Sequence, residues 1–248
     1  MYIYFLILVI VFYAVLPLVG VVQTARRGRK PLDSILTEKD RVNFYIKIIA
    51  NNLGQALVIL IFCLLAAISL YDIGLRGISL SQNIWFTVIT LIVSGGYLIA
   101  RIGGMIALLV SPKYREEQKE ELAKKNPNGA VNNMLPRSKK ERWYWLGVSL
   151  TAGIGEEIIF HGFLFFILQA VFPNMPILLA LAIASAIFGI GHAYQGIRGV
   201  AITAGIGALL GSLFLVTGSL IPSMFLHFIL DISSVFSLFE NAEQPQCE

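Results

Sequence analysis

Charged residues are scarce in this chain of 248 residues: Asp, Glu, Lys and Arg make up 14 % of it. Soluble domains carry roughly 25 %. Cysteine is scarcer still, with Cys63 inside an apolar run and Cys247 near the end of the chain. Two cysteines without paired or ligand-like spacing argue against a disulfide framework and against a zinc-finger motif.

Hydrophobic residues are correspondingly abundant, at 56 %, and they gather in runs long enough to cross a bilayer. The runs lie approximately at residues 1–22, 49–71, 84–110, 143–172, 177–196, 199–217 and 219–239. Because a spanning segment must satisfy its own backbone hydrogen bonds, we expect these runs to be helices. The sequence therefore predicts an all-α polytopic membrane bundle of about seven transmembrane helices.

Basic residues orient the predicted spans. Seven Lys and Arg residues lie in the 23–48 connection and nine in the 111–142 connection, whereas the 72–83 loop holds only Arg76. The positive-inside rule places the two basic connections in the cytoplasm. With one crossing per run, the N-terminus lies outside and the C-terminus in the cytoplasm. No basic residue precedes the first run, which we expect to be retained as an anchor in a bacterial cytoplasmic membrane.

The 111–142 connection also divides the chain. We expect residues 1–142 to hold three spans and basic cytoplasmic loops, residues 143–240 to form a compact four-helix core, and residues 241–248 to be a cytoplasmic tail. The charged part of the connection is expected to be solvated against lipid, with a turn at Asn126 to Gly129. The net charge of +4 favours anionic lipid headgroups as partners. Without interleaved aromatic residues it does not indicate nucleic acid.

Six ionisable residues lie inside the apolar runs of the predicted core: Glu156, Glu157, His161, His192, His227 and Asp231. Ionisable groups at membrane depth are costly, so such a cluster indicates a functional site that faces a polar interior. Ion pairs that only lock helices together are the alternative, above all for Glu157 with His161. Arg101 lies inside the third run, where it could pair with an acid of the cluster or extend to the cytoplasmic interface.

The spacing of these residues predicts their grouping. Glu157 and His161 are four residues apart and share a helix face, as do His227 and Asp231. Glu156 projects about 100° away from Glu157, so the two carboxylates can have different roles.

The cluster consists of three motifs: Glu-Glu-x-x-x-His-Gly at 156–162, Phe-x-x-x-His at 188–192 and His-x-x-x-Asp at 227–231. This series, over about residues 145–235, resembles the CPBP family of intramembrane proteases. That family includes the type II CAAX prenyl endopeptidases, the Abi proteins and the lysostaphin resistance protein A-like proteins. The resemblance implies an endopeptidase that cleaves a membrane-attached peptide, prenylated or not.

The resemblance also implies individual roles. Glu156 would activate water with the help of His192, while His227 and Asp231 would bind the other side of the reacting carbonyl. Glu157 would pair with an arginine, but this chain has His161 at the arginine position. His161 can replace that charge only when protonated, or else form a neutral hydrogen-bonded pair with Glu157.

Two mechanisms stay open. In one, Glu156, His192, His227 and Asp231 hold a divalent metal, of which zinc best suits nitrogen and oxygen ligands. In the other, the side chains activate water without a metal. The helical zinc motif His-Glu-x-x-His does not occur in the sequence.

Two other functions also fit buried acids and histidines. A proton-relay or transport protein would use the same residue types, although no inverted repeat supports it. A catalytically silent membrane scaffold is the second, and His161 in the arginine position favours it.

Overall fold

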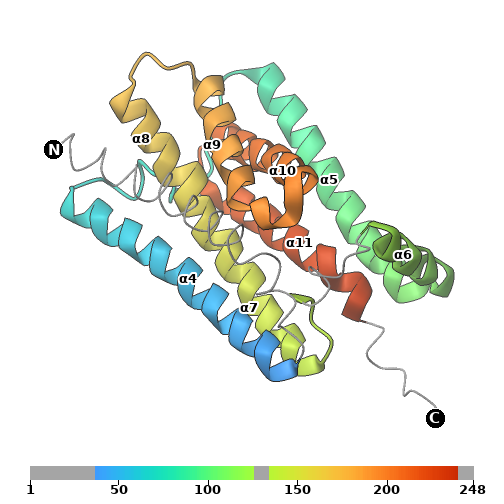
Figure 1. The fold of residues 1–248 in the computed structure, drawn as a ribbon. Coiled ribbons are helices and arrows are strands. Elements are labelled where there is room, and N and C mark those ends of the chain that lie inside the picture. Colours follow the sequence, from blue (N-terminus) through green and yellow to red (C-terminus); the bar gives the residue numbers. More distant parts are fainter. Residues whose placement is uncertain (1–36, 126–133, 240–248) are drawn as a thin grey trace, which may run out of the picture.

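The computed structural model describes residues 37–125 and 134–239, whose regular elements are all helical (Figure 1). They are α4 (Glu38–Leu65), α5 (Ile84–Val110), α6 (Pro112–Lys125), α7 (Lys139–Glu156), a π-helical turn (Glu157–Phe163), α8 (Leu164–Val171), α9 (Ile177–Gly191), a 3-10 turn (Ala193–Gln195), α10 (Gly196–Thr217) and α11 (Leu220–Phe239). Four of the described helices are long and apolar enough to cross a membrane, and two further apolar helices are shorter. The prediction of an all-α membrane bundle is confirmed.

The helix boundaries follow local capping signals. The predicted span 84–110 coincides with α5. Helix α5 begins at Ile84 because Asn83 caps it by accepting a hydrogen bond from the Phe86 amide. Helix α4 begins 11 residues before the predicted position 49, at Glu38, where Thr37 and Asp40 form a reciprocal capping box. Helix α9 ends at Gly191 rather than at 196. The predicted first span and the 126–129 turn lie outside the described residues.

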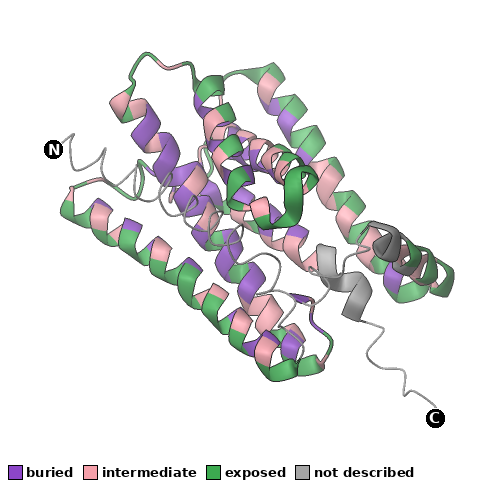
Figure 2. Ribbon diagram, in the orientation of Figure 1, coloured by how far each residue is buried: buried purple, intermediate pink, exposed green. Residues whose placement is uncertain are grey.

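The helix formed by α7, the π-helical turn and α8 is the centre of the bundle. In its most apolar stretch 61 % of the residues are buried, against 22 % in α4 and 11 % in α5. Figure 2 shows the same contrast, with buried positions concentrated along this central helix and exposed ones along α4 and α5. The outer helices therefore present apolar side chains to lipid, while the central helix carries the polar motif inside.

Glycines let the central helix approach its neighbours closely. A Cβ on Gly153 would lie 3.1 Å from the backbone oxygen of Met224 in α11, and one on Gly155 would lie 3.1 Å from that of Asn52 in α4. These close backbone contacts follow the small-residue packing that is common between membrane helices. They draw α11 and α4 against the residues just before Glu156.

Helices α4 and α7 run side by side in Figure 1 and are joined by a buried ion pair. The Arg41 guanidinium lies 2.8 Å from the Glu141 carboxylate, which is fully buried. Glu141 also closes the capping box with Ser138 at the start of α7. The predicted division between residues 142 and 143 falls inside α7, so no break in the helix separates the two parts there.

Candidate active site

The Glu156-Glu157 pair lies at the junction of α7 with the π-helical turn. In a π-helix each turn holds more residues than in an α-helix, and such turns are frequent at functional sites. Glu157 is fully buried, whereas the Glu156 side chain is 19 % exposed. The adjacent carboxylates therefore face different surroundings, as their angular separation predicts.

Glu157 joins two imidazole rings. One carboxylate oxygen accepts a hydrogen bond of 2.7 Å from Nδ1 of His161, and the other accepts one of 2.8 Å from Nδ1 of His227 in α11. A carboxylate offers only acceptors, so both Nδ1 atoms must donate. Glu157 thus fixes the orientation of His227 across a helix interface, beyond the predicted pair with His161.

His192 is oriented by the backbone of its own helix. Its Nδ1 donates to the Phe188 carbonyl oxygen at 2.9 Å. With Nδ1 occupied in this way, Nε2 is the nitrogen left to act on a ligand. The Phe188 ring packs against both histidines, with ring centroids 4.9 Å from His192 and 5.8 Å from His227.

The two remaining imidazole nitrogens converge on Glu156. Its Oε2 atom lies 3.9 Å from Nε2 of His192 and 4.0 Å from Nε2 of His227. Oε2 is buried and makes no hydrogen bond among the described residues. A buried carboxylate oxygen without a partner is costly in a structural role, and it suits a group that works on a bound molecule.

Asp231 completes the cluster on the more open side. Its carboxylate lies 3.9 Å from Nε2 of His227, one helical turn away in α11, and its side chain is 35 % exposed. The four residues predicted to be catalytic, Glu156, His192, His227 and Asp231, are thus brought together by three helical segments. The geometry rules out an arrangement in which Glu156 faces lipid away from the histidines.

His161 lies in a tight apolar pocket. It is fully buried, its Nε2 has no partner in the described part of the chain, and a Cβ on Gly211 would lie 2.9 Å from its ring. His161 therefore donates one hydrogen bond to Glu157, whereas an arginine at this position has five N–H donors. The small Gly211 gives this ring its space.

Sequence reasoning missed two features of the site. The contact between Glu157 and His227 joins residues 70 positions apart, so no local spacing signals it. Tyr194, in the 3-10 turn after His192, has its ring centroid 5.9 Å from the His192 ring and is 41 % exposed at the edge of the cluster. Its position two residues after His192 was the available signal.

The donor set suits zinc in type, since it offers imidazole nitrogens and carboxylate oxygens. Ligand atoms of a tetrahedral zinc ion are separated by about 3.3 Å, and the candidate ligand atoms of this site lie farther apart. The separations here are 3.9 and 4.0 Å, and no group of three or more His, Cys, Asp or Glu residues in the described ranges has metal-site geometry. The donor types fit a metal chemically, and these two separations exceed those between ligands of a bound ion by less than an ångström.

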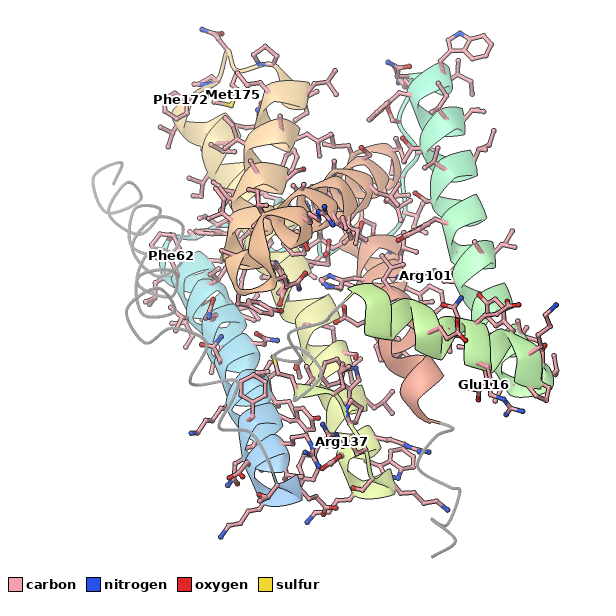
Figure 3. All side chains as sticks on the ribbon, turned by 45° about the vertical axis from the view of Figure 1, so that its right-hand side comes forward. Phe62, Arg101, Glu116, Arg137, Phe172 and Met175 are labelled. Atoms are coloured by element: carbon pink, nitrogen blue, oxygen red, sulfur yellow. The ribbon has the colours of Figure 1, made fainter. Side chains whose placement is uncertain are left out.

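Arg101 does not extend toward the end of α5. Its guanidinium lies over the ring of Tyr97, one turn back along the helix, at 5.5 Å from the ring centroid. Arg101 is labelled in Figure 3. Its Nε atom is buried and has no hydrogen-bond partner among the described residues. Neither of the two sequence expectations for Arg101 describes this contact.

Fold and site together define an integral membrane protein of the all-helical class with an intramembrane cluster of acids and histidines. Comparison with known families places this cluster more narrowly: residues 138–233 match the family model described as Rce1-like, type II CAAX prenyl endopeptidase. The match contains all six residues of the cluster, so this part of the chain is similar to that family over the region that holds the site. Comparisons with curated proteins and with solved structures give no match.

Proposed function

We propose that the chain is an intramembrane endopeptidase that hydrolyses a peptide bond of a membrane-attached substrate with a water activated by Glu156. The convergence of two imidazole Nε2 atoms on the unpartnered Oε2 of Glu156 is the observation that carries this proposal. Separations near 4 Å suit a water molecule held between the polar atoms. The family match supports a protease as the class of enzyme.

In the proposed reaction Glu156 takes a proton from water while the water oxygen attacks the carbonyl carbon. The oxyanion that forms accepts a hydrogen bond from protonated His227. Glu157 stabilises the positive charge of that ring, as the buried acid does in a Ser-His-Asp triad. Glu156 then passes its proton to the amide nitrogen as the carbon–nitrogen bond breaks, which leaves a carboxylic acid and an amine; the acid proton then transfers to the amine to give a carboxylate and an ammonium. His192 positions the water through Nε2.

A metal would be held by Glu156, His192, His227 and Asp231. It would supply Lewis acidity to the carbonyl and lower the pKa of the bound water. The orienting hydrogen bonds of His192 to Phe188 and of His227 to Glu157 serve either mechanism, because metal-binding histidines need the same support.

The site's surroundings support the proposed substrate class. The cluster lies inside a helical bundle whose outer faces are apolar, which favours a scissile bond in a chain held at the membrane. A helical substrate hides its backbone, so we propose that an unfolded peptide end enters. The family match makes a prenylated C-terminus the first peptide to test.

The test is cleavage in liposomes that contain the purified full chain. We expect a fluorogenic membrane-attached peptide to be hydrolysed with no imposed pH gradient, and the two fragments to be identified by mass spectrometry. The rival proton-relay function predicts gradient-driven proton flux and no fragments. A scaffold predicts neither signal, so either result without cleavage would overturn the proposal.

His161→Arg tests whether the histidine impairs the enzyme. Because His161 is fully buried against Gly211, the longer arginine overfills its pocket. We expect a loss of stability of about 1–3 kcal/mol and no gain in cleavage. Thermal unfolding in detergent and the liposome assay measure both quantities. A marked rise in activity would show instead that the wild-type chain is impaired at this position.

A further inference from the structure

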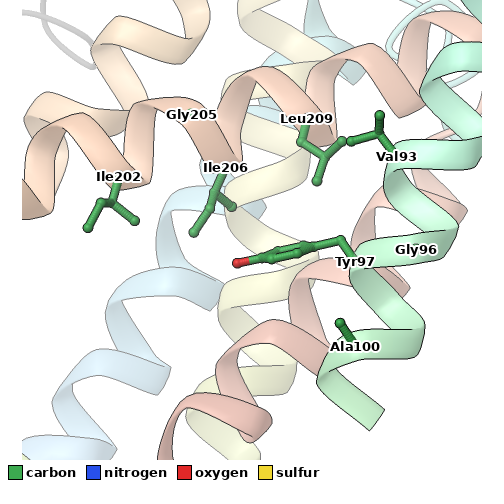
Figure 4. A pocket seen from close by; sticks show the side chains of 8 residues that line it. All are labelled: Val93, Gly96, Tyr97, Ala100, Ile202, Gly205, Ile206 and Leu209. Carbon is green, nitrogen blue, oxygen red and sulfur yellow. The ribbon is translucent and has the colours of Figure 1, made fainter. Parts of the chain in front are cut away.

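A groove separate from the acid and histidine cluster lies between α5 and α10 (Figure 4). It has a volume of about 500 Å³, within the range of ligand pockets. Its lining is apolar apart from the Tyr97 hydroxyl, and Figure 4 shows the Tyr97 side chain extending from α5 toward Ile206 of α10. None of the six residues of the cluster lines it.

Two glycines form the hollow part of the groove. Apart from the adjacent backbone of their own helices, Gly96 of α5 and Gly205 of α10 have no protein atom within 4 Å of the position a Cβ would take. Close helix packing therefore does not require glycine at these positions, unlike at Gly153. The absent side chains instead leave room for an apolar chain beside Tyr97.

A cation, Arg101, lies next to this apolar lining. The Arg101 guanidinium lies over the Tyr97 ring that lines the groove, with its Nε buried and unpartnered among the described residues. A guanidinium in an apolar span is costly unless an anion meets it. Its planar donors match a phosphate in two-pronged geometry.

We propose that this groove binds an anionic phospholipid, with one acyl chain along Gly96 and Gly205 and the phosphate at Arg101. Basic pockets between membrane helices bind anionic headgroups in this way. The lipid is a bound component of the fold and is not cleaved. The inference stands independently of the proposed proteolysis.

The test uses the purified full chain in detergent with dioleoylphosphatidylglycerol and dioleoylphosphatidylcholine as probes, and native mass spectrometry measures binding. We expect wild type to prefer the anionic lipid. Arg101→Gln should weaken its binding about fivefold, to the level of phosphatidylcholine. Gly205→Leu, which fills the groove, should weaken binding of both lipids.

Matched controls are Lys113→Gln, which removes an exposed cation, and Gly103→Leu, which adds the same side chain to α5 outside the groove lining. Both should bind like wild type. Equal binding of the two lipids by wild type, or unchanged binding by Arg101→Gln, would show only bulk lipid in the groove and overturn the proposal. Displacement of the lipid by a prenylated peptide, or a dimer lost in Gly205→Leu, would assign the groove to substrate or to a second copy. If Gly205→Leu does not fold, Arg101→Gln decides.

Discussion

Glu156→Gln should reduce cleavage by about 10²–10⁴-fold while the protein remains folded, because an amide cannot take a proton from water. The folded state should lose nothing, since the Glu156 Oε2 atom makes no hydrogen bond among the described residues. Its replacement removes a partly buried charge and leaves the Glu157 hydrogen bonds intact. The liposome assay and thermal unfolding of the same preparation measure the two effects.

Measuring cleavage and thermal unfolding together distinguishes a catalytic role of Glu156 from a structural one. A variant that loses activity and unfolds at lower temperature would place Glu156 in the scaffold. Unchanged turnover in a well-folded variant would remove Glu156 from the chemistry altogether. His192→Ala is a second probe, since its Nε2 faces the same oxygen at 3.9 Å.

Unlike Glu156→Gln, Glu157→Ala should lower the free energy of unfolding, by about 3–5 kcal/mol, as expected for breaking a buried charged network. The substitution leaves both His161 and His227 without their acceptor in a fully desolvated place. Unfolding in mixed micelles with increasing sodium dodecyl sulfate measures the loss. Glu117→Ala, at an exposed carboxylate of α6, should stay within about 0.5 kcal/mol of wild type.

Glu157→Gln separates packing from orientation at this position. The amide keeps the size of the side chain but offers one acceptor and one donor group, so one imidazole must present the other tautomer. We expect much of the stability to return and cleavage to stay low, because a neutral amide cannot stabilise a protonated His227. A Gln variant with full activity would show that Glu157 serves only to fill space.

The sequence predicted most of the helices because apolar runs and capping residues are local signals. Span 84–110 is bounded by Asn83 and by Ser111 with Pro112, and the structure follows it. The start of α4 was missed because Thr37 and Asp40 lie in a charged stretch that hydropathy discounts. A capping box carries the same information about helix initiation, independent of membrane depth.

Within the site, contacts one helical turn apart were predictable and contacts between helices were not. Glu157 with His161, and His227 with Asp231, follow from four-residue spacing. The bridge from Glu157 to His227 depends on how α11 lies against the π-helical turn, which Gly153 sets by close backbone contact. The π-helical turn itself has no distinctive sequence signature. The membership of the cluster was predictable from ionisable residues inside apolar runs, whereas the contacts between helices came from the structure.

The buried pair of Arg41 and Glu141 joins α4 to the family-matched region, residues 138–233, although α4 lies outside that region. An excised fragment that starts at residue 138 would keep Glu141 at the head of α7 but lose the guanidinium 2.8 Å away. It would also uncover the face that α4 covers. We therefore expect a minimal folded form of this protein to include α4 in addition to the matched region.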